Sequence, residues 1–544
     1  MGQQQCVCYN SIQKQTVANP MDPSTSPSFY STLQESTVDS IHPLNPSICS
    51  TPSCPSAIDR LTHRFGGRSL CMDIRKLYKF KTQIGVGHYG SVRIAYKKED
   101  TSPDPKQYAI KSISLKSIPE KELHEICREI EITSLLKHPN TIRFYETYFD
   151  NKYFHIVMQL CKGKDLYNKI QSHNVLSENV VKVIIYKILH GISYCHAKGI
   201  VHRDLKPENI LFVKDTLDSE IKISDFGLSK YISDPNEKMK SMVGTPYYIA
   251  PEVIKCSYNS KCDIWSIGVI AYVALCGELP FKDKKVAGIF KKISNVEPSF
   301  KEEEWENVSS NAIEFVKMCL IKKPEKRPNA VEALNHKWFD ELNSIYHHEM
   351  EFNEYEKDIL NNIKMFKYKH HFQILGLTYI LRFISDSEMK IIKELFFKIN
   401  TSHNGRICKD ELLFAFSKNG IKLNENEEEN MFMNINCFNC DTDILEYNHF
   451  IITGMNTKKY LNEDNLKKTF NYFDFNGDGF LNREDIEKSL MRDGVKRTFG
   501  VTVDIVREVL DNDIQIDYKR FKSFYIELPV DEVNVKKLTL KEEL

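Results

Sequence analysis

The pattern of apolar positions divides the chain into stretches of different character. Residues 1–72 are rich in Ser, Pro, Thr, Asn and Gln and show no hydrophobic period. So few apolar side chains cannot offset the entropy lost on ordering, which predicts a disordered extension. Residues 78–339 begin with strand-like segments and continue with helical patterns, whereas residues 386–544 repeat a helix–loop–helix pattern. Residues 340–385 connect the two.

Alternating apolar residues in the second stretch predict strands at 78–84, 91–96 and 107–112. An amphipathic helix is expected at about 121–136. The best apolar run, Ile264–Cys276, is shorter than the ~20 residues that cross a bilayer. A helix that is apolar on all sides is typical of the centre of a large domain, so we expect this run to be a buried core helix.

Composition narrows the function classes. The 74 basic and 74 acidic residues give a formal net charge of +0, so no bulk attraction to nucleic acid is expected and we predict no nucleic-acid partner. The 15 cysteines lack paired zinc-type spacings, and no secretory apolar segment begins the chain. We therefore expect a reduced, cytoplasmic setting in which most cysteines are small buried hydrophobes.

Four motifs carry candidate chemistry, in the order Gly85–Val92 (GVGHYGSV), Ala109–Lys111 (AIK), His202–Asn209 (HRDLKPEN) and Asp225–Gly227 (DFG). They supply a proton acceptor, a phosphate-neutralising lysine and two side chains that can bind Mg²⁺. Phosphoryl transfer from ATP to a hydroxyl requires this combination. A glycine triplet alone also occurs in dinucleotide-binding folds, but the four motifs in this order do not.

These motifs resemble those of eukaryotic protein kinases. The resemblance implies an α+β, bilobal kinase domain at 78–339, with Asp204 orienting the substrate hydroxyl and Lys206 neutralising the transferred phosphate. Lys111 should contact the ATP phosphates and pair with Glu129, or alternatively with Glu131. Mg²⁺ should be held by Asn209 and Asp225. The implied nucleotide contacts are Ile84, Gly85, Val86, Gly87, His88, Tyr89, Gly90, Ser91, Val92, Lys111 and Met158.

The same resemblance concerns the substrate. Lys206, together with Gly244-Thr245-Pro246, is similar to Ser/Thr rather than Tyr kinases, so we expect protein substrates with Ser or Thr. Asp165 and Glu208 match acidic positions that favour a basic residue before the acceptor. Glu252 is expected to form a structural ion pair with Arg327.

One loop in the last stretch, 474–485, fits the EF-hand pattern. Calcium needs six to eight oxygens, and glycine allows the sharp turn. Position 12 is normally Glu but is Asp485 here, which is one methylene shorter; this predicts weaker calcium binding and more tolerance of Mg²⁺. The expected oxygen donors are Asp474, Asn476, Asp478, the Phe480 carbonyl, Asn482 and Asp485.

Three further loops are weaker. In 400–411 the closing Glu411 is the only charged ligand, so the loop binds calcium weakly or not at all; its ligand positions are Asn400, Ser402, Asn404, Arg406 and Glu411. The loops at 438–449 and 509–520 lack the ligands, and Arg520 would repel a cation. They retain apolar residues at position 8, Leu445 and Ile516, through which such loops pair with a neighbour.

The connecting stretch carries Ile359, Ile363 and Phe366 at helical spacing beside Lys364 and Lys367. A basic amphipathic helix of this kind is a common calmodulin-type target. It can equally pack on its own domain, and the two interpretations are compatible.

A kinase domain, a basic junction and four EF-hand units resemble the calcium-dependent protein kinases of plants and protists. The resemblance implies a bilobal kinase fold followed by an all-α EF-hand domain, with ATP, Mg²⁺ and Ca²⁺ as cofactors. It also implies a junction helix that inhibits the kinase until calcium binds the EF-hand domain. Two alternatives remain: a kinase whose EF-hands are only structural, and a lipid-anchored calcium-sensing scaffold.

The first residues carry a possible lipid signal. Removal of Met1 would expose Gly2 for myristoylation, although the usual pattern has Ser or Thr where Cys6 stands. Cys6 and Cys8 could carry palmitate, and a second chain matters because one myristoyl group anchors only marginally. We expect a cytoplasmic protein peripherally bound to a membrane; the alternative is an ordinary disordered start.

Overall fold

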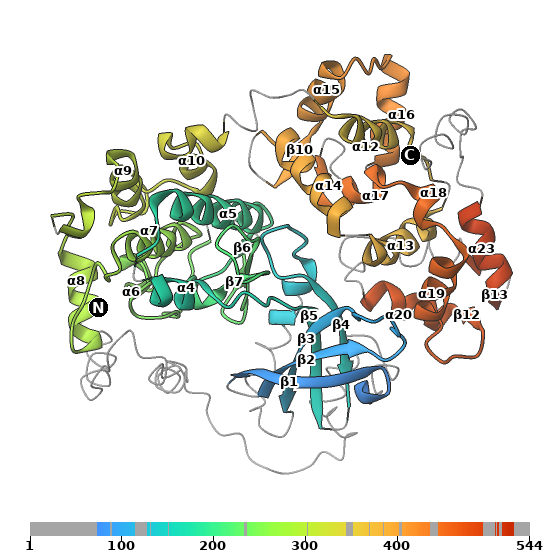
Figure 1. Ribbon diagram of the computed structural model, residues 1–544, viewed down its shortest axis with the longest axis horizontal. Helices are drawn as coiled ribbons and strands as arrows, with labels where there is room; N and C mark the ends of the chain where they lie inside the picture. Colours follow the sequence, from blue (N-terminus) through green and yellow to red (C-terminus); the bar gives the residue numbers. More distant parts are fainter. Residues whose placement is uncertain are drawn as a thin grey trace, which may run out of the picture. The chain divides into compact units, whose positions relative to one another are not determined.

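The computed structural model of the chain forms two compact units. The first unit contains the described residues up to 343, and the second contains nearly all of those from 352 onward (Figure 1). Gly2, Cys6, Cys8, His88, Tyr89, Ser402 and Asn404 lie outside the described residues. The described residues are 73–87, 90–114, 128–130, 132–150, 152–173, 175–232, 237–301, 303–343, 352–368, 370–384, 386–401, 405–435, 444–492, 506, 509–510 and 514–526.

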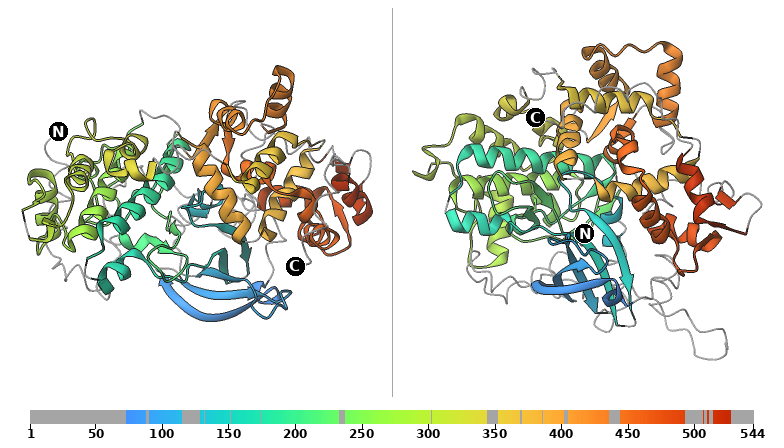
Figure 2. Two further views of the ribbon diagram at one scale, coloured as in Figure 1. Left: turned by 45° about the horizontal axis from the view of Figure 1, so that its top comes forward. Right: turned by 45° about the vertical axis from the view of Figure 1, so that its right-hand side comes forward.

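The first unit opens with an antiparallel five-stranded sheet in the order β1-β2-β3-β5-β4 (Figure 2). Its strands are β1 (Tyr78–Gly87), β2 (Gly90–Lys97), β3 (Gln107–Ser114), β4 (Phe144–Phe149) and β5 (Tyr153–Gln159). The three predicted strands are therefore confirmed, each slightly longer than its apolar pattern. A small core that includes Tyr78, Ile110 and Val157 lies against the sheet, beside the short helix η5 (Ile74–Lys76).

The rest of the first unit is mainly helical. Its helices are α4 (Leu166–His173), α5 (Glu178–Ala197), α6 (Pro251–Ile254), α7 (Lys261–Cys276), α8 (Val286–Asn295), α9 (Ser310–Cys319) and α10 (Ala330–Leu334). Short elements join them: β6 (Ile200–Val201), η7 (Pro207–Asn209), β7 (Ile210–Phe212), β8 (Ile221–Ile223), β9 (Lys230–Tyr231), η8 (Glu303–Trp305) and η9 (Lys337–Phe339).

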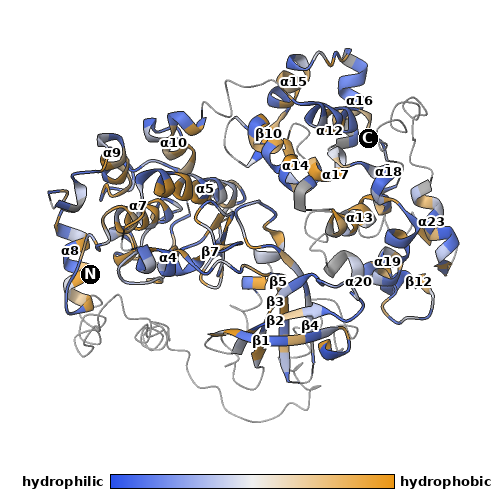
Figure 3. Ribbon diagram, in the orientation of Figure 1, coloured by the Kyte–Doolittle hydropathy of each residue, from blue (hydrophilic) through white to orange (hydrophobic). Residues whose placement is uncertain are grey.

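Helix α7 is the centre of this helical part. All its residues from Cys262 to Cys276 are buried, and α5 and α9 pack against it. Figure 3 shows the apolar colouring of α7 and α5. The predicted buried helix is therefore confirmed, and none of the described helices is long and apolar enough to span a membrane.

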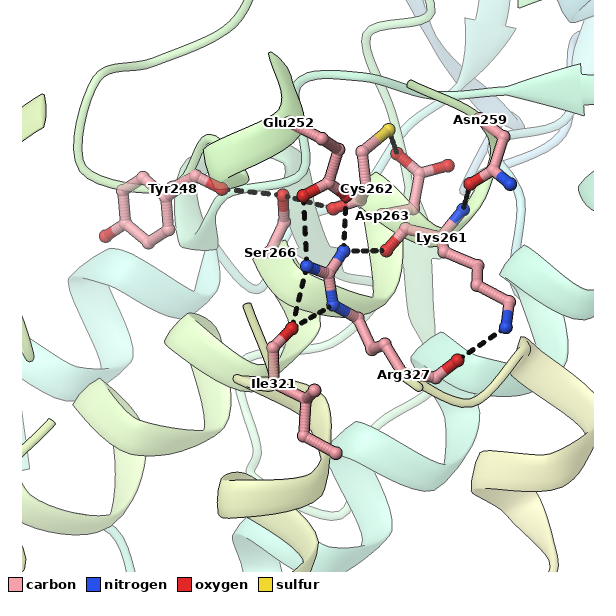
Figure 4. Close-up of polar contacts among 9 residues, drawn as sticks. All are labelled: Tyr248, Glu252, Asn259, Lys261, Cys262, Asp263, Ser266, Ile321 and Arg327. Carbon is pink, nitrogen blue, oxygen red and sulfur yellow. Dashed lines mark hydrogen bonds and ion pairs between the residues drawn. The ribbon is translucent and has the colours of Figure 1, made fainter. Parts of the chain in front are cut away.

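The predicted ion pair between Glu252 and Arg327 is present beside α7 (Figure 4). Arg327 Nη1 and Nη2 donate to the two carboxylate oxygens at 2.5 and 3.1 Å. The remaining guanidinium N–H groups donate to the carbonyl oxygens of Lys261 and Ile321. All five donors are thus used, as a guanidinium that is only 1% exposed requires.

The second unit is helical apart from two short sheets. Its helices are α12 (Glu354–Met365), α13 (His371–Ile380), η10 (Leu381–Phe383), α14 (Asp386–Ile399), α15 (Lys409–Lys418), α16 (Glu425–Ile435), α17 (Tyr447–Gly454), α18 (Thr457–Tyr460), α19 (Glu463–Phe473), α20 (Arg483–Arg492) and α23 (Tyr518–Ile526). The strands are β10 (Arg406–Cys408), β11 (Ile444–Glu446), β12 (Phe480–Asn482) and β13 (Gln515–Asp517).

The two sheets join the four loop units into two pairs. Strand β10 pairs with β11, which sets Ile407 opposite Leu445, and β12 pairs with β13, which sets Leu481 opposite Ile516. These four are the position-8 residues of the EF-hand pattern. The loops with few ligands therefore keep a structural function, since each completes the sheet of its neighbour.

Helices α12 and α13 of the connecting stretch pack on both pairs. Ile359, Ile363 and Phe366 are buried, and α12 lies against α14, α16 and α17. A Cβ at Gly454 of α17 would lie only 2.7 Å from Ile359 Cγ2, so glycine permits this approach. Helix α13 lies against α17, α19 and α23. The apolar stripe predicted from the sequence thus covers its own C-terminal unit.

Candidate active site and calcium-binding loops

The loop between β6 and β7 is fixed from below by Asp263 of α7. The fully buried carboxylate accepts the backbone N–H groups of His202 (2.9 Å) and Arg203 (2.8 Å) and a hydrogen bond from His196 Nε2 (2.8 Å). Burial acts to raise the pKa of Asp263, but these donors hold it below its usual value. The carboxylate therefore stays charged and holds Arg203 in the left-handed region, with φ of 69°.

Asp204 lies directly after this anchored turn, and both of its carboxylate oxygens are oriented. Lys206 Nζ donates to Oδ2 at 2.9 Å, and Thr245 Oγ1 donates to Oδ1 at 2.7 Å. Burial acts to lower the pKa of Lys206, but Asp204 and neighbouring carboxylates raise it overall, so the ammonium stays charged. The Asn209 amide donates to the Asp204 carbonyl oxygen at 2.8 Å.

Lys111 on β3 pairs with Glu129, with Nζ and Oε1 2.6 Å apart. Glu131, the alternative partner, lies outside the described residues. Burial opposes the charge of Lys111, but Glu129 and Asp225 raise its pKa overall. A Cβ at Gly227 would lie 3.3 Å from Asp225 and 3.5 Å from Glu129. The DFG turn therefore lies beside the ion pair of Lys111 and Glu129.

Asp225 and Asn209 are the two candidate Mg²⁺ ligands, and their surroundings fit a cation. Asp225 has φ of 62°, and although burial acts to raise its pKa, the charges of Lys111 and Lys206 lower it overall. The backbone N–H of Ser224 donates to the Asn209 carbonyl oxygen at 2.9 Å, which ties the two ligand segments together. Because the Asn209 amide nitrogen is bonded to Asp204, its side-chain oxygen is the atom left for a metal.

The glycine-rich motif lies in the β1–β2 hairpin and at its contact with β3. Gly85 lies opposite Val92, and Gly87 opposite Gly90, in the β1–β2 hairpin, where Ser91 also lies. A Cβ at Gly90 would lie 1.8 Å from the Ser112 carbonyl oxygen, so only glycine fits this approach of β2 to β3. Ile84 and Val86 are 49% and 80% exposed. Met158 of β5 lies opposite Ala109 of β3.

The loop from Asp474 to Asp485 has the turn that an EF-hand needs. Gly477 and Gly479 have φ of 71° and 83°, and their N–H groups donate to Asp474 at 2.8 and 2.9 Å. Asp478 accepts the Phe480 N–H at 2.8 Å, and Asn476 Nδ2 donates to Asp478 at 2.8 Å. These side-chain oxygens are of the hard type that calcium prefers.

The last ligand position of this loop is buried and bonded to the backbone. Asp485 is 2% exposed, and its two oxygens accept the N–H groups of Phe475 (3.2 Å) and Asn482 (3.1 Å). Within the described part of the chain, no group of three or more His, Cys, Asp or Glu side chains is gathered as a metal site. Both oxygens of Asp485 are therefore already bonded to the backbone of the loop.

The first loop shows the same use of its final acid. Glu411 accepts the Cys408 N–H at 2.8 Å and the Thr401 hydroxyl at 3.0 Å. Asn400 is fully buried and Arg406 lies in β10. Residues 438–443 and 511–513 of the other two loops lie outside the described residues, as do Ser402 and Asn404.

Two groups at the site were not assigned from the motifs. In the sequence, Asp263 appears only as a carboxylate before an otherwise apolar run. Thr245 belongs to the Gly244-Thr245-Pro246 motif, which gives no indication of a contact with Asp204. Neither position reveals from its spacing which loop it will contact, because the partners are 60 and 41 residues distant.

Comparisons with known proteins agree with this geometry. The family described as protein kinase domain matches residues 78–339. Calcium-dependent protein kinase 2 of Zea mays is 32% identical over 455 residues, which cover 82% of this chain and 86% of that protein. Calcium-dependent protein kinase 5 of Plasmodium falciparum is 32% identical (82% and 77% covered), and calcium-dependent protein kinase 19 of Arabidopsis thaliana is 33% identical (82% and 80% covered).

Proposed function

The chain belongs to the calcium-dependent protein kinases, and we propose that the residues gathered around Asp204 carry its phosphotransfer. It is a calcium-regulated serine/threonine protein kinase that uses ATP, Mg²⁺ and Ca²⁺ and acts on protein substrates.

The orientation of the Asp204 carboxylate is the observation that carries the proposal. Each of its oxygens accepts one hydrogen bond, from Lys206 or from Thr245, and keeps a second acceptor position for an incoming hydroxyl. Asp204 thus orients the substrate hydroxyl and accepts its proton, while Lys206 neutralises the charge on the moving phosphate.

The remaining motif residues hold the reactants. Bound ATP with Mg²⁺ supplies the transferable γ-phosphoryl group. Lys111, kept charged and positioned by Glu129, would hold the phosphates, and Asn209 with Asp225 would hold the metal. The glycine-rich hairpin would cover the nucleotide, because its backbone can approach closely only where no Cβ intervenes.

Asp204→Asn tests the catalytic assignment. The amide keeps the shape of the side chain but accepts no proton, so we expect phosphate transfer to fall about 100- to 10,000-fold. Nucleotide affinity and the thermal midpoint should stay unchanged. Transfer of labelled phosphate to a Ser peptide measures the loss, with Asp218→Asn, an exposed acid in the β7–β8 loop, as control. Normal turnover by Asp204→Asn would refute the assignment.

For regulation, we propose that the junction holds the kinase inactive and that calcium binding to the EF-hand domain releases it. The support is the burial of the α12 and α13 apolar faces within the EF-hand unit, which makes their position sensitive to that unit's conformation. Calcium shifts such an equilibrium only by its preference for the active arrangement. One loop, 474–485, carries the full set of oxygen ligands. The free energy by which calcium can shift the kinase toward its active arrangement is therefore small.

Calcium dependence and Asp485→Glu test this regulation together. We expect activity of the full chain to require calcium and to vanish with chelator. The longer Glu should raise calcium affinity about tenfold and the tolerance of Mg²⁺ should fall, as titration calorimetry would measure. Activity indifferent to calcium would instead favour structural EF-hands, and no activity under any condition would favour a scaffold. Unchanged affinity in Asp485→Glu would refute the explanation from side-chain length.

We also propose a preference for Arg or Lys before the acceptor, carried by Glu208 more than by Asp165. Asp165 already accepts bonds from the Asn168 backbone N–H at 2.7 Å and side-chain amide at 2.9 and 2.8 Å, whereas Glu208 is exposed. Glu208→Gln should therefore lower kcat/KM for Arg-containing peptides about tenfold, and Asp165→Asn by less. A peptide series with Gln in place of Arg is the control. Equal losses on both series would contradict the preference.

The sequence alone supports acylation, since Gly2, Cys6 and Cys8 lie outside the described residues. We propose myristate on Gly2 and palmitate on Cys6 or Cys8, which together would hold a cytoplasmic protein at a membrane. Gly2→Ala should abolish incorporation of labelled myristate, and Cys6→Ser with Cys8→Ser should release the protein from the membrane fraction. Labelling that persists in Gly2→Ala would overturn the proposal.

A further inference from the structure

Arg203 joins three segments that are far apart in the sequence. Its backbone N–H is bonded to Asp263, and its side chain turns toward the segment that follows the DFG turn. Nε donates to the Leu228 carbonyl oxygen at 2.6 Å. Nη1 donates to the Ser241 hydroxyl at 3.1 Å and to the Tyr258 hydroxyl at 3.3 Å. The guanidinium thus holds the start and the middle of this segment against the catalytic loop.

Tyr258 completes the connection from the other side. Its hydroxyl donates to the Ser241 carbonyl oxygen at 2.7 Å while it accepts from Arg203. Its backbone exchanges two hydrogen bonds with Met239, at 2.9 and 3.2 Å, and its side chain is almost fully buried. The hydroxyl keeps its proton, because burial raises the pKa of Tyr258 above its usual value.

The clamped segment leads directly to the catalytic carboxylate. Four residues after Ser241, the Thr245 hydroxyl donates to Asp204. Gly244 between them has φ of 113°, and a Cβ there would lie 2.7 Å from the Arg203 carbonyl oxygen. A shift of Ser241 therefore moves Thr245, and with it one of the two donors that orient Asp204.

We propose that Tyr258 is a positioning residue for phosphotransfer, whose hydroxyl fixes Ser241 and Arg203 so that Thr245 orients Asp204 and the peptide can dock. The inference rests on the proposed function of Asp204. The Tyr258 hydroxyl makes these contacts without any added group on Ser241. Tyr258 touches no reacting atom and acts only through Arg203 and the segment at 239–245.

The test is Tyr258→Phe in the full chain at saturating calcium. The variant loses the hydroxyl and leaves the Ser241 carbonyl oxygen without this donor. We expect kcat/KM for a Ser peptide to fall about tenfold, with KM for ATP unchanged. Ser241→Asp added to this variant should restore most of the loss, because a carboxylate gives Arg203 a charged partner in place of the hydroxyl.

Tyr272→Phe is the matched control. The Tyr272 hydroxyl also donates to a backbone carbonyl oxygen at 2.7 Å, that of Ser299, so the change removes the same kind of bond from α7. It should lower the thermal midpoint as much as Tyr258→Phe does while leaving the peptide kinetics unchanged.

The outcomes are separable. Unchanged peptide kinetics in Tyr258→Phe would overturn the inference, and so would equal kinetic losses in the two Tyr→Phe variants or no recovery with Ser241→Asp. None of these results affects the catalytic assignment of Asp204, which fails if Asp204→Asn keeps its activity.

Discussion

The active arrangement depends on one buried charge, the carboxylate of Asp263. A carboxylate without partners in this environment would be strongly destabilising, but here it accepts hydrogen bonds from His196 and from two consecutive backbone N–H groups, and a longer one from Cys262 Sγ. The two backbone bonds fix the turn that holds Arg203 in the left-handed region, which a side chain adopts only at a cost of about 1–2 kcal/mol. The strain is sustained because the acceptor lies on α7, a helix that is buried on every side and cannot move independently.

The catalytic groups are held in place through Asp263. Asp204 follows the fixed turn, and its carbonyl oxygen is bonded to Asn209, so the general base and one metal ligand are set by the same short segment. The Arg203 side chain in turn holds the segment that contains Thr245. A second buried charge, Arg327, acts near the start of α7, where it satisfies the Lys261 carbonyl oxygen as well as Glu252. The two charged side chains therefore attach two different segments to α7. Asp263 holds the catalytic loop, and Arg327 holds α6.

The sequence predicted the parts of this site whose chemistry is local. The strands predicted at 78–84, 91–96 and 107–112 are correct because alternating apolar residues indicate a half-buried sheet. The run Ile264–Cys276 is likewise buried as predicted, because it is apolar on all sides. The long-range contacts were harder. Glu252 and Arg327 were paired only through the family resemblance, and Thr245 was not connected with Asp204, because a hydroxyl in a turn carries no signal of its distant partner. The orientation of Asp485 was also beyond the sequence, since the backbone groups that compete for its oxygens become its neighbours only when the loop folds.

That competition bears on how calcium acts. In both loops with a final acid, the carboxylate accepts a backbone N–H just before the following helix, that of Asn482 for Asp485 and that of Cys408 for Glu411. Asp485 also accepts the N–H of Phe475 at the start of the loop. Calcium would therefore bind carboxylates that already accept backbone N–H groups, so the net gain is smaller than the full coordination energy. Helix α20 contacts α19, and α13 also packs against α19, so the loop at 474–485 is connected to the junction through these helix contacts. Calcium bound at this loop would shift the junction only to the extent that it binds one arrangement of these helices more tightly than the other.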